Sequence, residues 1–261
     1  MPPSVRGGGR LPDGCDAVLD PELATGSAPF VEIIETIAPG THVRLPGHDL
    51  AAGEIIAPAG ARVDASTALA CRVVGIESIE VRSPRVGIDL ADAAITRWLA
   101  AELDRLGCSM VSADEVADLR LRDASGTGPR LAIRPGEAGW IERSGGEIVI
   151  EVPGRFDGAM GAYTFLVLPV LARLFGLSLR EIVLPVSAKI ASAIGSSDLV
   201  LLSATNTALA PLCAGDMPLR AFARASHFLV IPPDSEGLDA STPVAAISLA
   251  EPFGFEMASE E

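Results

Sequence analysis

Two proline–glycine turns enclose a short polar hairpin in the middle of this chain. The first, Pro135-Gly136, follows Arg134, and the second, Pro153-Gly154, is followed at once by Arg155 and an apolar helical pattern. The backbone N–H groups in the first turn of a helix have no partner within the helix and carry partial positive charge, so they can hold a phosphate or another oxyanion. The residue types therefore indicate an anion site at the two turns, although many strand–turn–helix junctions are only turns.

The same segment resembles the carboxyl-terminal part of a known family. In that family a K-P-G-K-P turn, a short hairpin, an L-P-G-N-P turn and a helix with a late proline follow one another. The corresponding residues here are Arg134 to Ala138, Val152 to Phe156, and Pro169. The family is the molybdopterin molybdenumtransferases, of the MoeA and gephyrin E-domain type, which insert molybdate into molybdopterin in the last step of molybdenum-cofactor synthesis.

Two upstream stretches extend the resemblance. The stretch from Gly40 to Gly60, GTHVRLPGHDLAAGEIIAPAG, resembles the family block G-x-x-[IV]-R-x-x-G-E-D-x-x-x-G. The stretch from Leu11 to Glu22, LPDGCDAVLDPE, resembles P-x-G-x-D-A-V-x-x-x-E. The matches keep the order of the family and span most of residues 11 to 252.

Several departures identify the chain as a reduced and divergent member. The T-G-D-E-L motif should follow the strand at residues 84–88, but Asp89-Leu90 leads directly into a helix. The S-G-G-x-S-x-G loop should lie between Cys108 and Arg130, where Gly126-Thr127-Gly128 is the only glycine-rich remnant. The room before Leu11 is too short for the helical domain that precedes this block in the family.

The resemblance implies roles for residues in three places. Asp49 and Glu54 would be catalytic and would hold Mg²⁺, and Asp89 would be a third catalytic carboxylate. Binding of molybdopterin or its adenylate, and of molybdate, would fall to Arg44, Arg134, Pro135, Gly136, Pro153, Gly154 and Arg155. Without the resemblance, the 44–54 loop would be interpreted as a solvated turn whose charged side chains form incidental ion pairs.

Three side chains near these positions oppose tight anion or metal binding. Glu137 stands where the family usually has lysine, which reverses a charge. His48 replaces a glutamate, which removes a carboxylate from the expected magnesium site. Asp157, in the first turn of the helix, would repel an anion unless Arg155 offsets it, although the helix dipole favours a carboxylate there in any case.

Composition excludes several classes of partner. The net charge is -14 over 261 residues, whereas phosphate-backbone binding needs a basic surface, so nucleic acid is not expected. The cysteines at 15, 71, 108 and 213 form no C-x-x-C pair, which argues against a zinc site or a disulfide framework. The N-terminus lacks the apolar run of a signal peptide, so a cytoplasmic location is expected.

The stretch from Gly158 to Ala172 is uncharged and superficially similar to a membrane span. A membrane span needs about 20 apolar residues. This stretch is shorter, because the charged residues Asp157 and Arg173 stand directly before and after it. Its apolar residues recur at helical spacing. We expect a buried helix, kinked at Pro169, and no membrane association.

The elements that must position these residues fall into three regions of an α/β multidomain protein. Residues 11–82 predict a small β-rich domain, with strands at 31–34, 54–56 and 78–81 and one helix between Asp64 as cap and Gly75 as stop. Residues 83–176 predict a truncated α/β domain of the molybdopterin-binding type: a strand, a helix, a strand, then the hairpin and the second helix. Residues 177–252 predict strands at 182–184, 199–202, 228–231 and 244–249, and the resemblance makes this region the family's C-terminal β-barrel domain.

Three functional interpretations stay open at this point. The chain is a molybdopterin molybdenumtransferase-like enzyme, or a catalytically inactive relative that serves as a molybdopterin-binding scaffold or as the maturation partner of an apo-molybdoenzyme, or a paralogue that binds no ligand. The resemblance also implies a homodimer, in which the 44–54 loop of one subunit completes a cleft begun by the two turns of the other.

Overall fold

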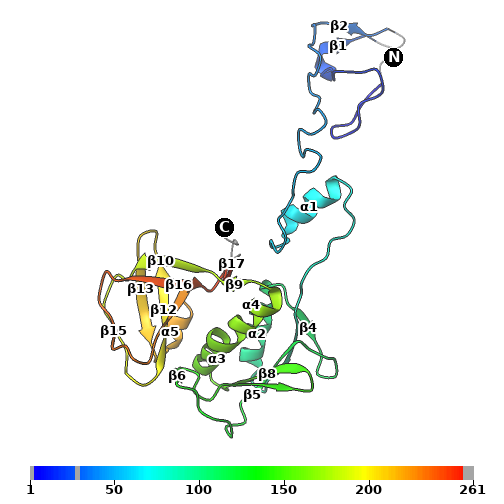
Figure 1. Ribbon diagram of the computed structural model, residues 1–261. Coiled ribbons are helices and arrows are strands. Elements are labelled where there is room, and N and C mark those ends of the chain that lie inside the picture. The colour runs from blue at the N-terminus through cyan, green and yellow to red at the C-terminus, as the bar shows by residue number, and fades with distance from the viewer. Residues whose placement is uncertain (1–2, 27–29, 255–261) are drawn as a thin grey trace. The chain divides into compact units, whose positions relative to one another are not determined.

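The computed structural model describes residues 3–26 and 30–254, and the chain divides into two compact units, Met1–Pro58 and Ala59–Glu261 (Figure 1). The first unit contains a 3-10 turn, η1 (Pro21–Leu23), and a small antiparallel pair, β1 (Ala24–Thr25) with β2 (Glu32–Ile33). The strand expected at 31–34 therefore forms only at its centre.

The prediction of a strand at 54–56 is wrong. The N–H of Glu54 bonds to the carbonyl of Ala51, and the Glu54 carboxylate accepts from the Ala51 N–H at 2.9 Å. This local turn competes with extended pairing.

The second unit begins with the helix expected after Asp64. Helix α1 (Ala65–Val73) starts where the Asp64 carboxylate accepts from the Thr67 N–H at 2.7 Å, and Gly75 follows its end with φ +84°. Both signals are confirmed. The strand expected at 78–81 is wrong, because these residues lie beside no partner strand and a strand without a neighbour gains no ladder of hydrogen bonds.

A five-stranded, mostly parallel sheet forms the next layer. Its order is β4-β3-β5-β8-β7, and only the β7–β8 hairpin is antiparallel. The strands are β3 (Arg85–Asp89), β4 (Ser109–Val111), β5 (Leu119–Asp123), β7 (Trp140–Ser144) and β8 (Glu147–Val152). The strand, helix, strand and hairpin expected in this region are thus present, and β4 is an additional strand.

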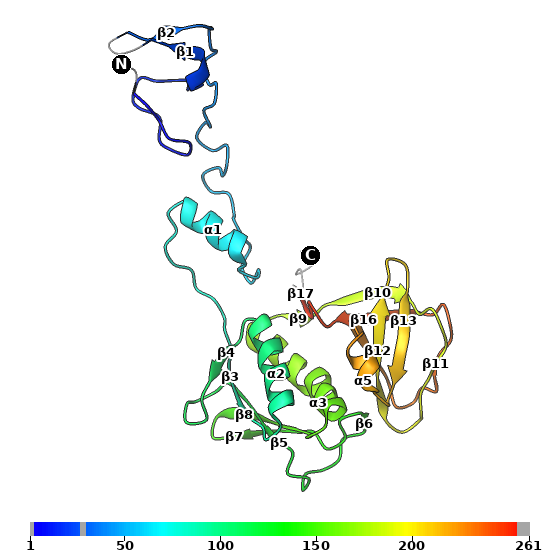
Figure 2. The same cartoon turned by 180° about the vertical axis from the view of Figure 1, so that it is seen from behind.

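Two helical segments run side by side along this sheet (Figures 1 and 2). One is α2 (Ala93–Arg105), whose Ile95, Leu99 and Leu103 are buried, as its apolar spacing predicts. The other is continuous from α3 (Phe156–Ala162) through a π-helical turn, η2 (Tyr163–Val167), to α4 (Leu168–Phe175). Their buried faces share one core with Val86, Leu119, Leu121 and Ile150 of the sheet.

The continuous segment Phe156–Phe175 is long and apolar enough, by length and composition, to cross a membrane. About 67% of its most apolar stretch is buried inside the fold, as in the core helix of a globular protein. Pro169 has no N–H to give to Phe165, and the π-turn just before it, where the Leu168 N–H bonds to the Tyr163 carbonyl, adjusts the helix at this point.

The last part of the chain forms a six-stranded sheet. Its path is β10-β16-β14-β12-β13, and β6 (Ile133–Arg134) adds to β12 in parallel. The other strands are β10 (Glu181–Pro185), β12 (Ser197–Ala204), β13 (Leu209–Ala214), β14 (His227–Ile231) and β16 (Pro243–Ser248). The same part of the chain also contains the short helix α5 (Leu219–Phe222) and two small antiparallel pairs. These pairs are β9 (Ser178–Leu179) with β17 (Phe253–Gly254), and β11 (Ile190–Ala191) with β15 (Gly237–Leu238). The four strands predicted here are confirmed. Strand β13 is an additional strand at the edge of the sheet, a position at which its Pro211 is tolerated.

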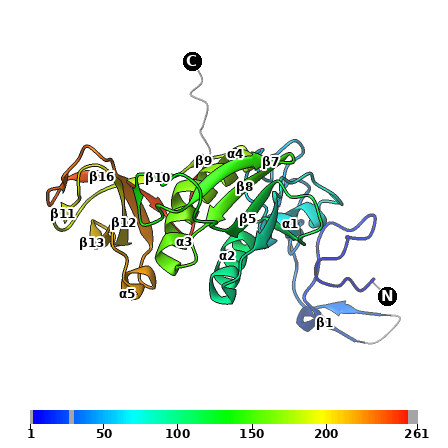
Figure 3. The same cartoon turned by 90° about the horizontal axis from the view of Figure 1, so that it is seen from below.

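The expected C-terminal β-barrel is not confirmed. The six-stranded sheet curls until Val186, just after β10, bridges Leu209 of β13, but within the described residues the two edge strands make no further pairing. Leu199, Leu201 and Phe228 of this sheet pack into the core that α3 and α4 share with the five-stranded sheet. Helix α3 accordingly lies between the two sheets (Figure 3).

Candidate ligand-binding site

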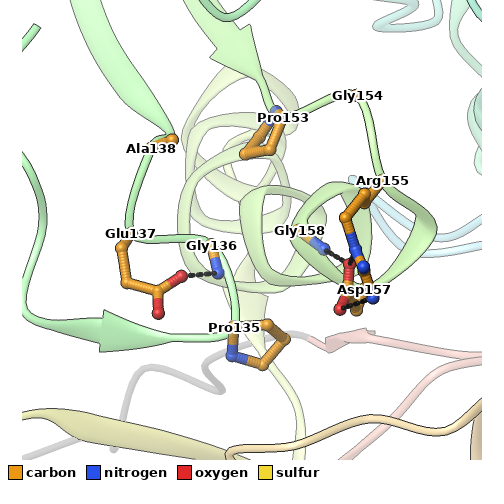
Figure 4. Close-up of a pocket in the computed structure, with 9 residues that line it drawn as sticks. All are labelled: Pro135, Gly136, Glu137, Ala138, Pro153, Gly154, Arg155, Asp157 and Gly158. Carbon is orange, nitrogen blue, oxygen red and sulfur yellow. Dashed lines mark hydrogen bonds and ion pairs between the residues drawn. The ribbon is translucent and has the colours of Figure 1, made fainter. Parts of the chain in front are cut away.

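The two proline–glycine turns enclose a hollow of about 410 Å³ at the start of α3 (Figure 4). It lies at the carboxyl end of β8, the edge of a parallel sheet where ligands bind in open α/β folds. Its lining residues are Pro135, Gly136, Glu137, Ala138, Pro153, Gly154, Arg155, Asp157 and Gly158. The two turns that the sequence indicated as an anion site thus line one hollow, and their binding of a ligand stays a prediction.

Two glycines of α3 let the turns approach the helix backbone. A methyl group added at Gly161 would lie 1.9 Å from the carbonyl oxygen of Pro135, and one added at Gly158 would lie 2.6 Å from the ring of Pro153. Gly136 itself has φ +118°, a conformation that other residues rarely adopt. The spacing of three residues between Gly158 and Gly161 places both on one helix face, which fixes both turns against α3.

Arg155 and Asp157 form an ion pair on one wall of the hollow. The guanidinium donates from Nη2 to Asp157 Oδ2 at 3.0 Å and from Nε to Oδ1 at 3.2 Å, and Oδ1 also accepts from the Gly158 N–H at 2.8 Å. Burial opposes ionisation of Asp157, but the bonds from Arg155 and Gly158 outweigh it and lower the pKa of Asp157. The Arg155 side chain remains 78% exposed, so it can still reach a ligand.

The opposite wall carries Glu137, whose carboxylate accepts from the Gly136 N–H at 3.1 Å (Figure 4). The charge reversal seen in the sequence therefore lies inside the hollow. With Glu137, Asp157 and Arg155 ionised, the formal charge of the lining is −1.

Arg134 does not line the hollow. Its guanidinium donates from Nε and Nη2 to the two carboxylate oxygens of Asp198 on β12, at 2.7 and 2.6 Å. Asp198 is 1% exposed and also accepts from the Ser192 hydroxyl at 2.7 Å. Burial would raise the pKa of Asp198, but the bonds from Arg134 and Ser192 outweigh it and lower the pKa. Arg134 thus ties β6, and the Pro135-Gly136 turn after it, to the C-terminal sheet.

Asp89 lies at the carboxyl edge of β3, two strands away from β8, and its carboxylate is engaged by Arg120. Arg120 is 3% exposed, and it donates from Nη1 to Asp89 at 3.2 Å and from Nε to Glu147 at 2.9 Å. The bonds from Arg120 and from the Ala117 N–H hold the pKa of Glu147 at about 2, below its usual value of 4.5. Asp92, the next acidic residue, caps α2 by accepting from the Ala94 and Ile95 N–H groups, as a capping role predicts.

Arg44, Asp49 and Glu54 belong to the first unit. Arg44 and Asp49 form an exposed ion pair, and the Glu54 carboxylate caps the Ala51 N–H. Within residues 3–26 and 30–254, no three His, Cys, Asp or Glu side chains are grouped so as to hold a metal ion. The Mg²⁺ that the resemblance implied therefore stays a prediction.

Comparison with known proteins gives a match in the first part of the chain. The family model of the MoeA N-terminal region (domain I and II) matches residues 4–75, in the part of the chain that carries the two upstream motifs. Residues 4–75 are MoeA-like. No curated protein gave a match.

Similar solved structures extend the likeness in fold beyond residue 75. The molybdopterin biosynthesis MoeA protein of Pyrococcus horikosii is 21% identical, with a TM-score of 0.62, over 92% of this chain and 74% of that one. A molybdenum cofactor biosynthesis protein of Pyrococcus furiosus is 18% identical, with a TM-score of 0.60, over 77% of this chain and 82% of that one. At these identities the likeness shows the fold, a mixed α/β arrangement of several sheets and few helices.

Sequence reasoning missed three charged residues that organise this MoeA-like fold, Arg120, Glu147 and Asp198. A signal was available for two of them. Arg120 alternates with Leu119 and Leu121 in a buried strand, and Asp198 stands directly before the apolar run of β12. A charge in such a place needs a partner, because burial of an unpaired charge is costly. The identity of the partner could not be read from the pattern.

Proposed function

We propose that this chain acts in molybdenum-cofactor biosynthesis and binds molybdopterin, or its adenylate, in the hollow between the two proline–glycine turns. One observation carries the proposal. A hollow of about 410 Å³ opens at the carboxyl end of β8 in a MoeA-like fold, at the two turns that resemble the family's motifs. That edge of a parallel sheet is where α/β folds bind phosphorylated ligands.

Arg155 is the residue proposed to contact the ligand's phosphate. Its side chain is exposed beside the hollow, and a guanidinium matches the geometry of a phosphate. Pro135, Gly136, Pro153 and Gly154 are proposed to shape the site. The position of Arg134 supports an indirect part, because its guanidinium is bonded to Asp198.

Two activities remain for such a site. In the first, the chain inserts molybdate into molybdopterin, with Asp49, Glu54 and Asp89 as catalytic carboxylates. In the second, it is a scaffold that holds molybdopterin for a partner such as an apo-molybdoenzyme. The engagement of Asp89 by the buried Arg120 favours the second, because that carboxylate is already paired, whereas Asp49, although paired with Arg44, stays exposed and does not separate the two activities.

The remaining parts of the proposal concern organisation. We propose three domains, residues 11–82, 83–176 and 177–252, and a cytoplasmic homodimer. In this dimer the 44–54 loop of one subunit would complete the cleft formed by the turns of the other. Closed two-fold dimers are the commonest soluble assemblies, which supports this arrangement.

Ligand binding is tested by purifying the full chain from a host that makes the cofactor and measuring the fluorescence of oxidised pterin released from it. We expect a pterin signal from the wild-type chain and a weaker one from Arg155→Ala. Arg143→Ala, an exposed arginine on the β7 hairpin strand, is the matched control and should retain the wild-type signal. A wild-type chain free of pterin would contradict the proposal.

The two activities are separated by reconstitution. The chain, molybdopterin adenylate, molybdate and magnesium are mixed with an apo-molybdoenzyme, and recovery of that enzyme's activity is followed. A scaffold should give little or no recovery beyond the control without the chain. Recovery as fast as with a complete MoeA protein would favour the transferase and would show that Asp49, Glu54 or Asp89 leaves its present partner.

A further inference from the structure

Two backbone N–H groups that line the hollow are hydrogen-bonded to carboxylates of the hollow itself. The Gly136 N–H is bonded to Glu137 Oε2 at 3.1 Å, and the Gly158 N–H is bonded to Asp157 Oδ1 at 2.8 Å (Figure 4). An incoming oxyanion would need donors of this kind. Both are already bonded to acidic side chains.

The two carboxylates differ in their surroundings. Asp157 is paired with Arg155, so its charge is balanced where it lies. Glu137 forms no ion pair in the part of the chain that the structure describes, and the nearby Arg134 is bonded to Asp198. The carboxylate of Glu137 is therefore attracted to Arg134 only at longer range; the bond to Asp198 chiefly raises the pKa of Arg134, and Glu137 adds to this effect without pairing.

We propose that Glu137 is a built-in competitor that keeps small inorganic oxyanions out of this hollow. Its carboxylate occupies the Gly136 N–H and adds a like charge, so phosphate or molybdate alone must break a hydrogen bond and approach an anion. The proposal rests on the proposed function only in taking the hollow as the ligand site. Glu137 then determines specificity.

A larger ligand meets a different situation. It can leave the Gly136 N–H to Glu137 and bind through Arg155, or it can displace the carboxylate and offer it an N–H donor of its own. A displaced carboxylate without a donor loses a charge-assisted hydrogen bond. Molybdate has no O–H donor at neutral pH and so has no equivalent route, and hydrogen phosphate can offer only its own one or two O–H groups. The hollow accordingly selects a ligand that combines an anionic group with hydrogen-bond donors.

The test is calorimetric titration of inorganic phosphate, and separately of molybdate, into the full chain. Glu137→Gln removes the charge but keeps an oxygen that can accept from the Gly136 N–H, whereas Glu137→Ala removes both. We expect weak binding to the wild type, tighter binding to Glu137→Gln, and the tightest binding to Glu137→Ala, by at least about tenfold over the wild type. Glu142→Ala, at an exposed position of β7, is the matched control and should bind as the wild type does.

The outcomes separate this inference from the proposed function. If Glu137→Ala binds phosphate and molybdate no better than the wild type, the competitor role is overturned, even where the wild type retains pterin. If Glu137→Ala gains affinity but neither protein retains pterin, the competitor role stands and molybdopterin is the wrong ligand. Thermal unfolding of each variant with and without phosphate gives a second readout, since a bound ligand raises the midpoint.

Discussion

Asp198 is the residue through which the C-terminal sheet holds the first turn of the hollow. It accepts both hydrogen bonds of the Arg134 guanidinium, and Gly215, with φ +66°, lies so close that a methyl group there would be 2.8 Å from Asp198 Oδ1. The pair joins residues 64 positions apart in sequence. At the scale of single residues, charged side chains such as Arg134 and Asp198 serve first to hold the backbone in position, and contact with a ligand is secondary.

Asp198→Asn should lower the free energy of unfolding by about 1–3 kcal/mol, since a buried acceptor of charge-assisted hydrogen bonds is replaced by a neutral amide. The lower half of that range is expected, because the Arg134 side chain is 37% exposed and water compensates part of the loss. Urea denaturation of the full chain measures the change. Asp239→Asn, in the exposed pair with Lys189, should stay within about 0.5 kcal/mol of the wild type, and an equally small effect at Asp198 would refute the structural role.

Glu147 predicts a pH dependence of stability. Its pKa is lowered from 4.5 to about 2 by the bond from Arg120. A carboxylate with a depressed folded-state pKa stabilises the fold fully above the unfolded-state value, and this contribution is lost as the pH falls from about 4.5 towards about 2. Glu147→Gln should flatten that part of the stability profile, measured by urea midpoints at several pH values. Glu142→Gln, on the neighbouring strand, should leave the profile unchanged, and an unaltered profile for Glu147→Gln would contradict the assignment.

At the scale of elements, the contact between α3 and the two turns decides whether a hollow exists at all. Gly161→Ala places a methyl group 1.9 Å from the Pro135 carbonyl oxygen, so either the turn or the helix must move. We expect a loss of about 1–3 kcal/mol, the usual cost of overpacking, together with weaker pterin retention. The measurement is urea denaturation, followed by pterin release.

Gly154→Ala is the matched control for this contact. Gly154 is in the second turn, and a methyl group there would meet no heavy atom within 4 Å. Its stability should stay close to that of the wild type. Equal stability of the Gly161 and Gly154 variants would mean that α3 and the first turn do not touch as described.

At the scale of the whole molecule, the proposed homodimer can be measured directly. Light scattering at about micromolar concentration should give twice the 26.9 kDa mass of one chain. We expect a dimer because the charged side chains of the 44–54 loop form only local bonds within their own chain: Arg44 pairs with Asp49, and Glu54 caps the Ala51 N–H. A second subunit would give this loop a cleft to complete. A monomer under these conditions would remove the shared cleft from the proposal.

The sequence by itself determined the elements whose signals are local. Asp64 and Gly75 bound α1, the apolar spacing selects the buried face of α2, and the turns before and after the hairpin adopt their places through proline and glycine geometry. These features depend on neighbours within a few residues, so spacing is enough to predict them. The strands expected at 54–56 and 78–81 failed for the complementary reason: a strand needs a partner, and the pattern alone does not say whether one is present.

Only the tertiary structure decided what the charged residues do. The sequence and its resemblance to the family indicated Arg134, Arg155 and Asp89 as site residues. Of these three, Arg134 bonds to Asp198, Asp89 bonds to Arg120, and only Arg155 lines the hollow. The long flexible side chain of an arginine can reach any carboxylate that the fold brings within a few ångströms, and which one that is depends on pairings such as β6 with β12 and β3 with β5. Burial then strengthens the chosen pair, because water no longer competes for its hydrogen bonds. The charge of the hollow follows from that choice of partners.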